Sequence, residues 1–269
     1  MTTRTAREGA PTRDDRVGAP SRVVPSLGRW ADHPVVRAER DGWDVLDVVA
    51  RDDALVVRRA FDAGSAALSG LGTPTGVADL LLDRPDLAAG VVRSSLPRGT
   101  TTAAAALGGR TGRAVPEHLR AEPVSRWDWF TATSEPPAQP GEQRVVALDG
   151  DEGRARVRAV LDVANPSAEL DPSEPGTRWW GWRDETGTVR SVAGARRSGP
   201  GVPWSLGGVA TDPAARGRGA ARAVVAVATR ACLHDEGIVV LGMYADNDAA
   251  RRVYAALGFV VTQEFESRR

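Results

Sequence analysis

The residues whose types and spacing best fit a chemical role form a basic turn near the C-terminal end of the 269-residue chain. Two arginines alternate with two glycines and two alanines follow them: Arg216, Gly217, Arg218, Gly219, Ala220 and Ala221. Guanidinium groups bind anions, and residues without a Cβ let backbone amides approach an anion closely. The turn therefore predicts a site for an anionic group such as the pyrophosphate of a cofactor.

A strand and a helix must hold this turn. The strand is the run 204–211, and Asp212 and Pro213 end it because proline lacks the amide that a sheet ladder needs. After the turn, apolar side chains from Ala221 to Cys232 fall on one helical face, and Gly237 is the expected stop. A helix that begins at the turn directs its free amides and the positive end of its dipole toward a bound anion.

Three kinds of phosphate-binding loop compete for this pattern. A nucleoside triphosphate P-loop needs a lysine after its last glycine, and the chain contains no lysine. A dinucleotide fingerprint GxGxxG that begins at Gly217 would need a third glycine where the chain has Arg222. The remaining pattern, arginine or glutamine followed by xxGxG or xxGxA, fits Arg216, Gly219 and Ala221. An ordinary solvated turn is the alternative.

A second segment follows directly. Residues 238–244 form an apolar run of strand length, and Asn247 is a good helix N-cap. Four side chains then share one helical face, at i, i+3, i+4 and i+7: Ala250, Val253, Tyr254 and Leu257. Gly258 is placed to end this short amphipathic helix.

Together the two segments resemble the GNAT superfamily of acyl-CoA N-acyltransferases. The first carries the arginine-x-x-glycine-x-alanine turn, and the second carries a motif NxxAxxxYxxxGF, here Asn247, Ala250, Tyr254, Gly258 and Phe259. Two independent motifs in the order and spacing of the family are a specific signal. The bias toward Ala, Arg, Gly and Val is typical of a GC-rich coding genome such as that of an actinobacterium.

The resemblance implies that acetyl-CoA is the acyl donor and that no metal takes part. It implies that the turn residues 216–221 hold the pyrophosphate and that the strand end contacts the pantetheine arm through Val209, Ala210 and Thr211. It implies a cofactor contact for Asn247, whose alternative is a bare helix cap. It also implies that Tyr254 is the general acid for the leaving thiolate, and the alternative is a core aromatic residue.

The sequence indicates less about the acceptor of the acetyl group and about the base. The strand 204–211 contains no carboxylate to serve as a base, and Glu169, Asp171 and Glu174 in the preceding loop are either bases or parts of a solvated loop. The predicted function is transfer of an acetyl group by direct attack of an amine, with a small molecule as acceptor. A protein N-terminus and an antibiotic amine are alternative acceptors. A non-catalytic acyl-CoA-binding or regulatory protein is the alternative function.

The predicted fold is α/β, a mixed and mainly antiparallel twisted sheet flanked by helices, with a smaller divergent N-terminal α/β domain. The boundaries place a disordered arm at 1–21, a divergent domain at 22–134, a proline-containing linker at 135–143 and the GNAT domain at 144–269. In layout, the divergent domain resembles a degenerate GNAT half. It shows strand-like runs at 43–49, 54–61, 90–93 and 125–133 and a helix at 76–82. The alanine-rich segment at 100–107 is ambiguous between helix and strand.

Composition excludes several classes of partner and site. Thirty-five arginines balance 35 acidic residues, so we expect no general attraction to nucleic acid or to anionic membranes. The single cysteine, Cys232, excludes an internal disulfide, and its place on an apolar helix face predicts a core residue. With no signal peptide and no apolar run of spanning length, the expected protein is soluble and cytoplasmic. The sequence leaves the oligomeric state open.

Overall fold

The structure is a computed structural model that describes residues 27–62 and 64–269, and the predicted N-terminal arm lies outside these ranges. The strands are Val45–Ala50 (β1), Ala54–Ala60 (β2), Ala66–Gly72 (β3), Val91–Pro97 (β4), Ser125–Ala132 (β5), Val145–Ala147 (β6), Thr177–Arg183 (β7), Val189–Arg196 (β8), Trp204–Thr211 (β9), Val239–Tyr244 (β10) and Val260–Arg268 (β11). The α-helices are Pro34–Glu39 (α1), Pro74–Asp83 (α2), Thr100–Thr111 (α3), Gly150–Ala164 (α4), Ala220–Glu236 (α5) and Asp248–Ala256 (α6).

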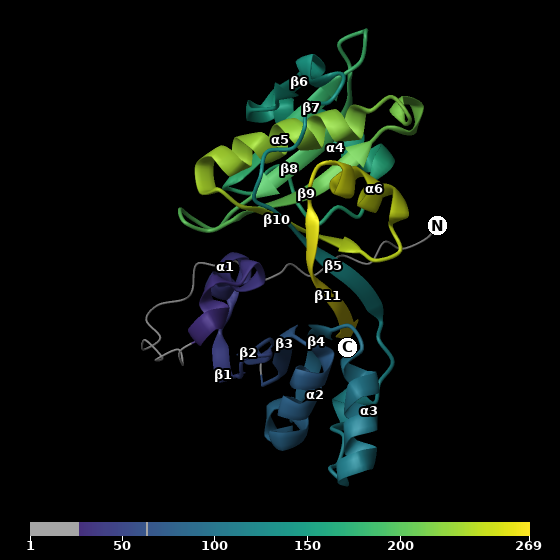
Figure 1. Cartoon of the computed structure of the whole chain (residues 1–269). Helices are drawn as coiled ribbons and strands as arrows, with labels where there is room; N and C mark the ends of the chain where they lie inside the picture. The colour runs from purple at the N-terminus through teal and green to yellow at the C-terminus, as the bar shows by residue number, and fades with distance from the viewer. Residues whose placement is uncertain (1–26, 63) are drawn as a thin grey trace, which may run out of the picture.

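Within the described ranges, the strands of both halves form one sheet in the order β1-β2-β3-β4-β11-β5-β10-β9-β8-β7-β6. The pairs β3 with β4 and β9 with β10 are parallel, and the other neighbouring strands are antiparallel. This confirms the predicted mixed, mainly antiparallel sheet flanked by helices. Figure 1 shows the C-terminal half above the N-terminal half, with β5 and β11 joining them.

Helices cover both faces of the C-terminal part of the sheet. Helix α5 packs on β7, β8 and β9, and α4 packs on the opposite face of the same strands. The strand period of two explains the division, because Trp179 of β7 joins the α4 cluster and Trp180 and Trp182 join the α5 cluster. These tryptophans are core residues.

The N-terminal part has the same layering. Ala54 and Val56 of β2 pack in the cluster under α2, and the alternate residues Leu55 and Val57 pack in the cluster under α1. The α1 cluster also contains Trp129 and Val240, from β5 and β10. The core under α1 therefore joins the two halves.

At the centre of the sheet, each half places one strand between two strands of the other half. Strand β5 lies between β10 and β11, with Ala132 opposite Val239 and Trp127 opposite Tyr244. Strand β11 in turn lies between β4 and β5, with Phe265 opposite Pro97. The predicted boundaries at 134 and 144 remain a prediction, and the sheet is continuous across them.

The order of pairing is the same in both halves. The parallel pair β3 and β4 is followed by α3 and β5, and one strand from the other half, β11, lies between β4 and β5. The parallel pair β9 and β10 is followed by α6 and β11, with β5 of the other half between β10 and β11. The resemblance of the N-terminal half to a degenerate GNAT half stays a prediction.

Sequence patterns miss, leave open or shorten several elements of the N-terminal half, among them α1, where the pattern predicts no helix. Strand β3 contains Gly70 and Gly72, which have low strand propensity, so no strand is expected there. The ambiguous segment at 100–107 is part of α3, whose buried face consists of small residues such as Ala104 and Gly108. The strand expected at 90–93 continues to Pro97, where Pro97 pairs with Phe265 of β11.

Candidate active site

The parallel strands β9 and β10 separate beyond their first residues. Their register pairs are Val239 with Trp204 and Val240 with Ser205, whereas β9 continues to Thr211 and β10 to Tyr244. The edge of β9 that faces β10 therefore has no strand partner over its second half. Unpaired backbone groups along an extended edge can bind an extended ligand chain. The predicted pantetheine contacts Val209, Ala210 and Thr211 lie on this half of β9.

A β-bulge bends β9 where it leaves β10. Gly194 of β8 lies opposite Gly207 and Val192 lies opposite Ala210, so two residues of β9 face one residue of β8. Gly208 in the bulge has φ +60°, and a methyl group added there would lie 2.4 Å from Trp179 Cη2. Only glycine combines this backbone with this contact. The opening between the strands is thus built into the backbone of β9.

The basic turn lies at the end of this opening. A short 3-10 turn at Pro213–Ala215 follows β9, and the side chain of Asp212 accepts a hydrogen bond from the amide of Ala214 at 2.9 Å. Arg216 Nε donates to the carbonyl of Thr211 at 3.3 Å, which ties the turn to the strand. Gly217 and Gly219 have φ values of +78° and +79° and are exposed.

Helix α5 begins directly at this turn. Its N-cap is Gly219, and among the described residues no side chain caps the first helical amides. The nearest acid to Arg218 is Glu185, at 3.9 Å between side-chain atoms. Uncapped amides, the positive end of the helix dipole and two exposed arginine charges together fit a pyrophosphate. The structure places residues 216–221 side by side in one turn, with 216–219 exposed and Ala220 buried at the start of α5. Their role in binding stays a prediction.

Asn247 caps α6. Its Oδ1 accepts a hydrogen bond from the amide of Ala250 at 3.1 Å, so the capping role is present in the structure. The residue is exposed, and its side-chain NH₂ group is left for a ligand. The cofactor contact expected for Asn247 is compatible with the cap and stays a prediction.

Tyr254 points from α6 into the apolar cluster that also contains Met243 of β10, with Val209 of β9 packed against it. Its ring lies 6.1 Å from that of Phe130 and 5.7 Å from that of Phe259. The residue is 7% exposed, and burial raises the pKa of its hydroxyl to about 12. Within residues 27–62 and 64–269 its hydroxyl has no hydrogen-bond partner, so it is free to donate to a ligand.

Comparisons with known proteins decide the family of this segment. Residues 148–259 match the model of the Acetyltransferase (GNAT) family. Residues 148–259 form a GNAT acetyltransferase domain. None of the curated proteins compared with the chain matches it.

Solved structures resemble the chain over both halves. A GCN5-related N-acetyltransferase from Kribbella flavida is 15% identical, with a TM-score of 0.50, over 82% of this chain and 88% of that one. A GNAT-family protein from Novosphingobium aromaticivorans is 21% identical, with a TM-score of 0.49, over 88% of this chain and 96% of that one. At these identities the likeness concerns the fold alone.

Sequence reasoning missed one buried charge that supports the GNAT domain. Asp128 of β5 is fully buried, and its carboxylate accepts hydrogen bonds from Arg251 of α6 and from Arg98 before α3. Arg98 also donates to Glu264 of β11 at 2.9 Å. Strand β5 thus fixes the helix that carries Tyr254. The single carboxylate in the Trp-rich run 125–132 was the only sequence signal for it.

The predicted base candidates of the GNAT domain are held in structural contacts. The carboxylate of Asp171 accepts hydrogen bonds from the hydroxyl and amide of Ser173 and pairs with Arg158, and these contacts lower its pKa to about 2. Glu174 accepts a hydrogen bond from the amide of Asp171 at 3.3 Å and lies 3.5 Å from Arg196. Glu169 is exposed. A carboxylate with so low a pKa is a weak base.

The N-terminal half has a turn between β3 and α2, in the same topological position as the basic turn at 216–221 between β9 and α5. Its backbone amides are already engaged. Thr73 caps α2 by accepting a hydrogen bond from the amide of Gly76 at 3.0 Å, and Pro74 occupies the first helical position. The amide of Gly72 donates to Gln263 Oε1 at 3.0 Å. The amides of Gly72 and Gly76 have partners and Pro74 has no amide. This turn therefore lacks the free amides that the turn at 216–221 presents.

Three further properties concern the described ranges as a whole. Every helix in them is too short or too polar to cross a lipid bilayer. No three or more His, Cys, Asp or Glu side chains gather there in a geometry that would hold a metal ion. Cys232 is buried, as predicted, and burial raises the pKa of its thiol to about 12.

Proposed function

We propose that this chain transfers an acetyl group from acetyl-CoA to the amine of a small molecule by direct attack. The observation that carries the proposal is the continuous path along β9, from the unpaired strand edge at Val209–Thr211 to the exposed amides of the turn at 216–221. Such a path suits a ligand with an extended polar arm and a pyrophosphate. The buried ring of Tyr254 packs in the same cluster as Val209.

Acetyl-CoA, when bound, supplies an activated thioester carbonyl. The backbone edge of β9 orients the arm that carries it, and the dipole of α5 and the arginines of the turn hold the anionic end. Fixing both ends places the thioester in the opening between β9 and β10. We assign the predicted contacts Val209, Ala210, Thr211 and Asn247 to this positioning.

Tyr254 acts on the leaving sulfur by donating a hydrogen bond. With a pKa of about 12 for Tyr254 and about 8.5 for a thiol, full proton transfer would be uphill by about 5 kcal/mol. A hydroxyl with this pKa stays protonated at neutral pH. It therefore stabilises the developing thiolate without giving up its proton completely.

The acceptor amine reacts in its neutral form. A primary alkylamine with a pKa near about 10 is mostly charged at neutral pH. The low pKa of Asp171 and the lack of a carboxylate on β9 leave the proton to pass to solvent. The rate is then expected to rise with pH toward the pKa of the acceptor.

Isothermal titration with CoA and acetyl-CoA, followed by a thiol-release screen over small amines, tests the proposal. Binding of acetyl-CoA together with release of thiol in the presence of an amine supports it. Binding without turnover on any amine supports the second function, a non-catalytic acyl-CoA-binding or regulatory protein, which the engaged carboxylate of Asp171 favours. Absence of binding contradicts both.

A further inference from the structure

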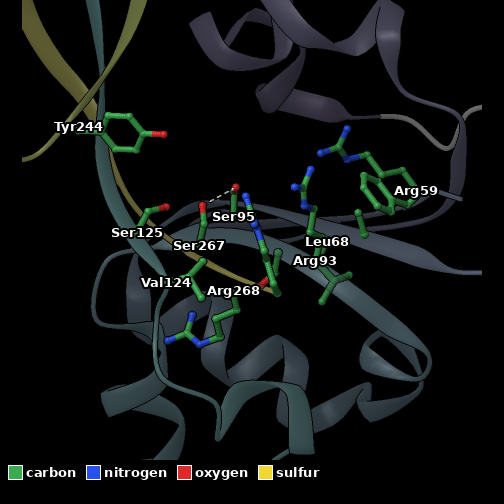
Figure 2. Close-up of a pocket in the computed structure, with 13 residues that line it drawn as sticks. Arg59, Leu68, Arg93, Ser95, Val124, Ser125, Tyr244, Ser267 and Arg268 are labelled. Carbon is green, nitrogen blue, oxygen red and sulfur yellow. Dashed lines mark hydrogen bonds between the residues drawn. The ribbon is translucent and has the colours of Figure 1, made fainter. Parts of the chain in front are cut away.

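A cavity of about 440 Å³ lies on the sheet away from the proposed acyl-CoA path. Small residues in register on neighbouring strands leave the space. Ser95 of β4 lies opposite Ser267 of β11, which lies opposite Ser125 of β5. The hydroxyls of Ser95 and Ser267 are 2.9 Å apart and form a polar floor (Figure 2).

Two arginines stand at one end of this cavity. Arg59 of β2 and Arg93 of β4 lie opposite Ala67 of β3, one on each side. Only the methyl group of Ala67 stands between the two arginine side chains on this face of the sheet. Arg93 lies over the ring of Phe61, with its guanidinium carbon 5.0 Å from the ring centre. Figure 2 shows Arg59 and Arg93 on one side of the cavity and Tyr244 on the other.

Neither arginine is neutralised. In the described part of the chain, no carboxylate lies within 4 Å of Arg59 or Arg93, although many other arginines there form ion pairs. Arg59 Nε is buried without a hydrogen-bond partner. Burial and the charge of Arg93 lower the pKa of Arg59, and the one acid whose charge opposes this is Glu39. The residues that line the cavity include no aspartate or glutamate, but they do include Arg268, which pairs with Glu266, and the last residue, Arg269, with its main-chain carboxylate.

Tyr244 is the cavity-lining residue on the strand next to β9 in the sheet order. It is the last residue of β10, the strand that separates from β9, and its side chain lines the cavity. Its neighbour Met243 joins the cluster of Tyr254, so the side chain of Tyr244 lies on the opposite face of β10. Strand β4, with Arg93, lies three strands away through β5 and β11. At about 4.8 Å between neighbouring strands, this corresponds to about 14 Å across the sheet.

We propose that this pocket binds a carboxylate or phosphate group of the acceptor, held by Arg59 and Arg93 while the amine of the same molecule lies at the Tyr244 end. The inference rests on the proposed acetyl transfer. It narrows the acceptor to an amine with an anionic group at its far end. Two neighbouring guanidinium groups without a carboxylate partner are complementary to such a group, and the serine hydroxyls add donors.

The test compares acceptors of graded length. Aminoalkyl carboxylates and aminoalkyl phosphates are assayed against amino alcohols of the same length, with the wild-type protein and the double variant R59Q/R93Q. We expect wild type to prefer the anionic acceptors by at least about 10-fold in kcat/KM, and the double variant to lose that preference. The control is R110Q, which removes an exposed arginine outside the pocket and keeps the preference. The better of the two anionic series identifies the group.

A second measurement does not depend on turnover. Inorganic phosphate is titrated by calorimetry into protein saturated with CoA, so that the turn at 216–221 is already filled. Binding to wild type and at least about 10-fold weaker binding to R59Q/R93Q support the pocket. Equal phosphate affinity in the two proteins, or an unchanged acceptor preference, overturns it. Failure of the proposed function would appear separately, as absence of CoA binding or of thiol release with any amine in wild type, and the phosphate titration would still test the pocket.

Discussion

The carboxylate of Asp128, on β5, accepts a hydrogen bond from the guanidinium of Arg251, on α6. The first residue belongs to the N-terminal half and the second to the helix that carries Tyr254. Asp128 is fully buried, whereas the side chains of Arg251 and Arg98 are 33% and 28% exposed. The N-terminal half thus supports the proposed acid through one buried charge.

Replacing Asp128 with Asn tests this support. The change leaves two partly buried arginines without their shared carboxylate, and we expect the free energy of unfolding to fall by about 3 kcal/mol in urea denaturation. The matched control is Asp151→Asn, whose exposed pair with Arg154 is expected to contribute under about 0.5 kcal/mol. Similar losses in the two variants would contradict a special role for Asp128.

Replacing Tyr254 with Phe removes the hydroxyl and keeps the buried ring. We expect kcat for thiol release to fall about 100-fold while the Kd for CoA is unchanged, since the hydroxyl acts on the leaving sulfur. Because the pKa of Tyr254 is about 12, the wild-type rate should show no decline from this group below about pH 11. Unchanged thiol release would exclude Tyr254 as the donor.

Replacing Gly208 with Ala tests the bulge of β9. The new methyl group would lie 2.4 Å from Trp179 at a φ of +60°, so we expect a loss of about 3 kcal/mol in unfolding free energy and weaker CoA binding. Gly187→Ala is the control, because Gly187 has φ +82° with no atom within 4 Å of the added group. It should lose only about 1 kcal/mol and bind CoA normally. Equal losses would mean that the Trp179 contact does not matter.

Calorimetry with CoA tests the number of cofactor sites. The turn before α2 is closed by Thr73 and Pro74, so we expect one CoA per chain. Arg216→Ala should weaken CoA binding about 10-fold, because it removes both the charge and the side-chain donors from the remaining turn, and Arg110→Ala should not. Two equivalent sites would contradict the asymmetry between the halves.

The buried thiol of Cys232 predicts an alkaline loss of stability. Its pKa is raised by burial from 9.0 to about 12, so the unfolded chain loses the proton first as the pH rises. This contribution is complete below about pH 9 and is lost above it, by about 0.8 kcal/mol between about pH 7.5 and 9.5. The corresponding decline in unfolding free energy should be absent from Cys232→Ala. An identical decline in both proteins would show that another group causes it.

The sequence by itself determined the local elements of the proposed acyl-donor site. The basic turn and the helix with Tyr254 lie within about 50 contiguous residues, and their periodicity and capping are local, so strand β9 and helices α5 and α6 follow from the pattern. The burial of Cys232 follows in the same way, because a helical face depends only on residues three and four positions apart.

Only the tertiary structure decided how the halves combine and what lies beside the donor site. The contact between Asp128 and Arg251 spans 123 residues, and that between Gly72 and Gln263 spans 191. The arginine pocket takes side chains from β2 and β4, which lie on either side of β3, and from β10, which lies beyond β11 and β5 in the same sheet. Such pairings depend on sheet order, and no local period or propensity in a single sequence encodes sheet order.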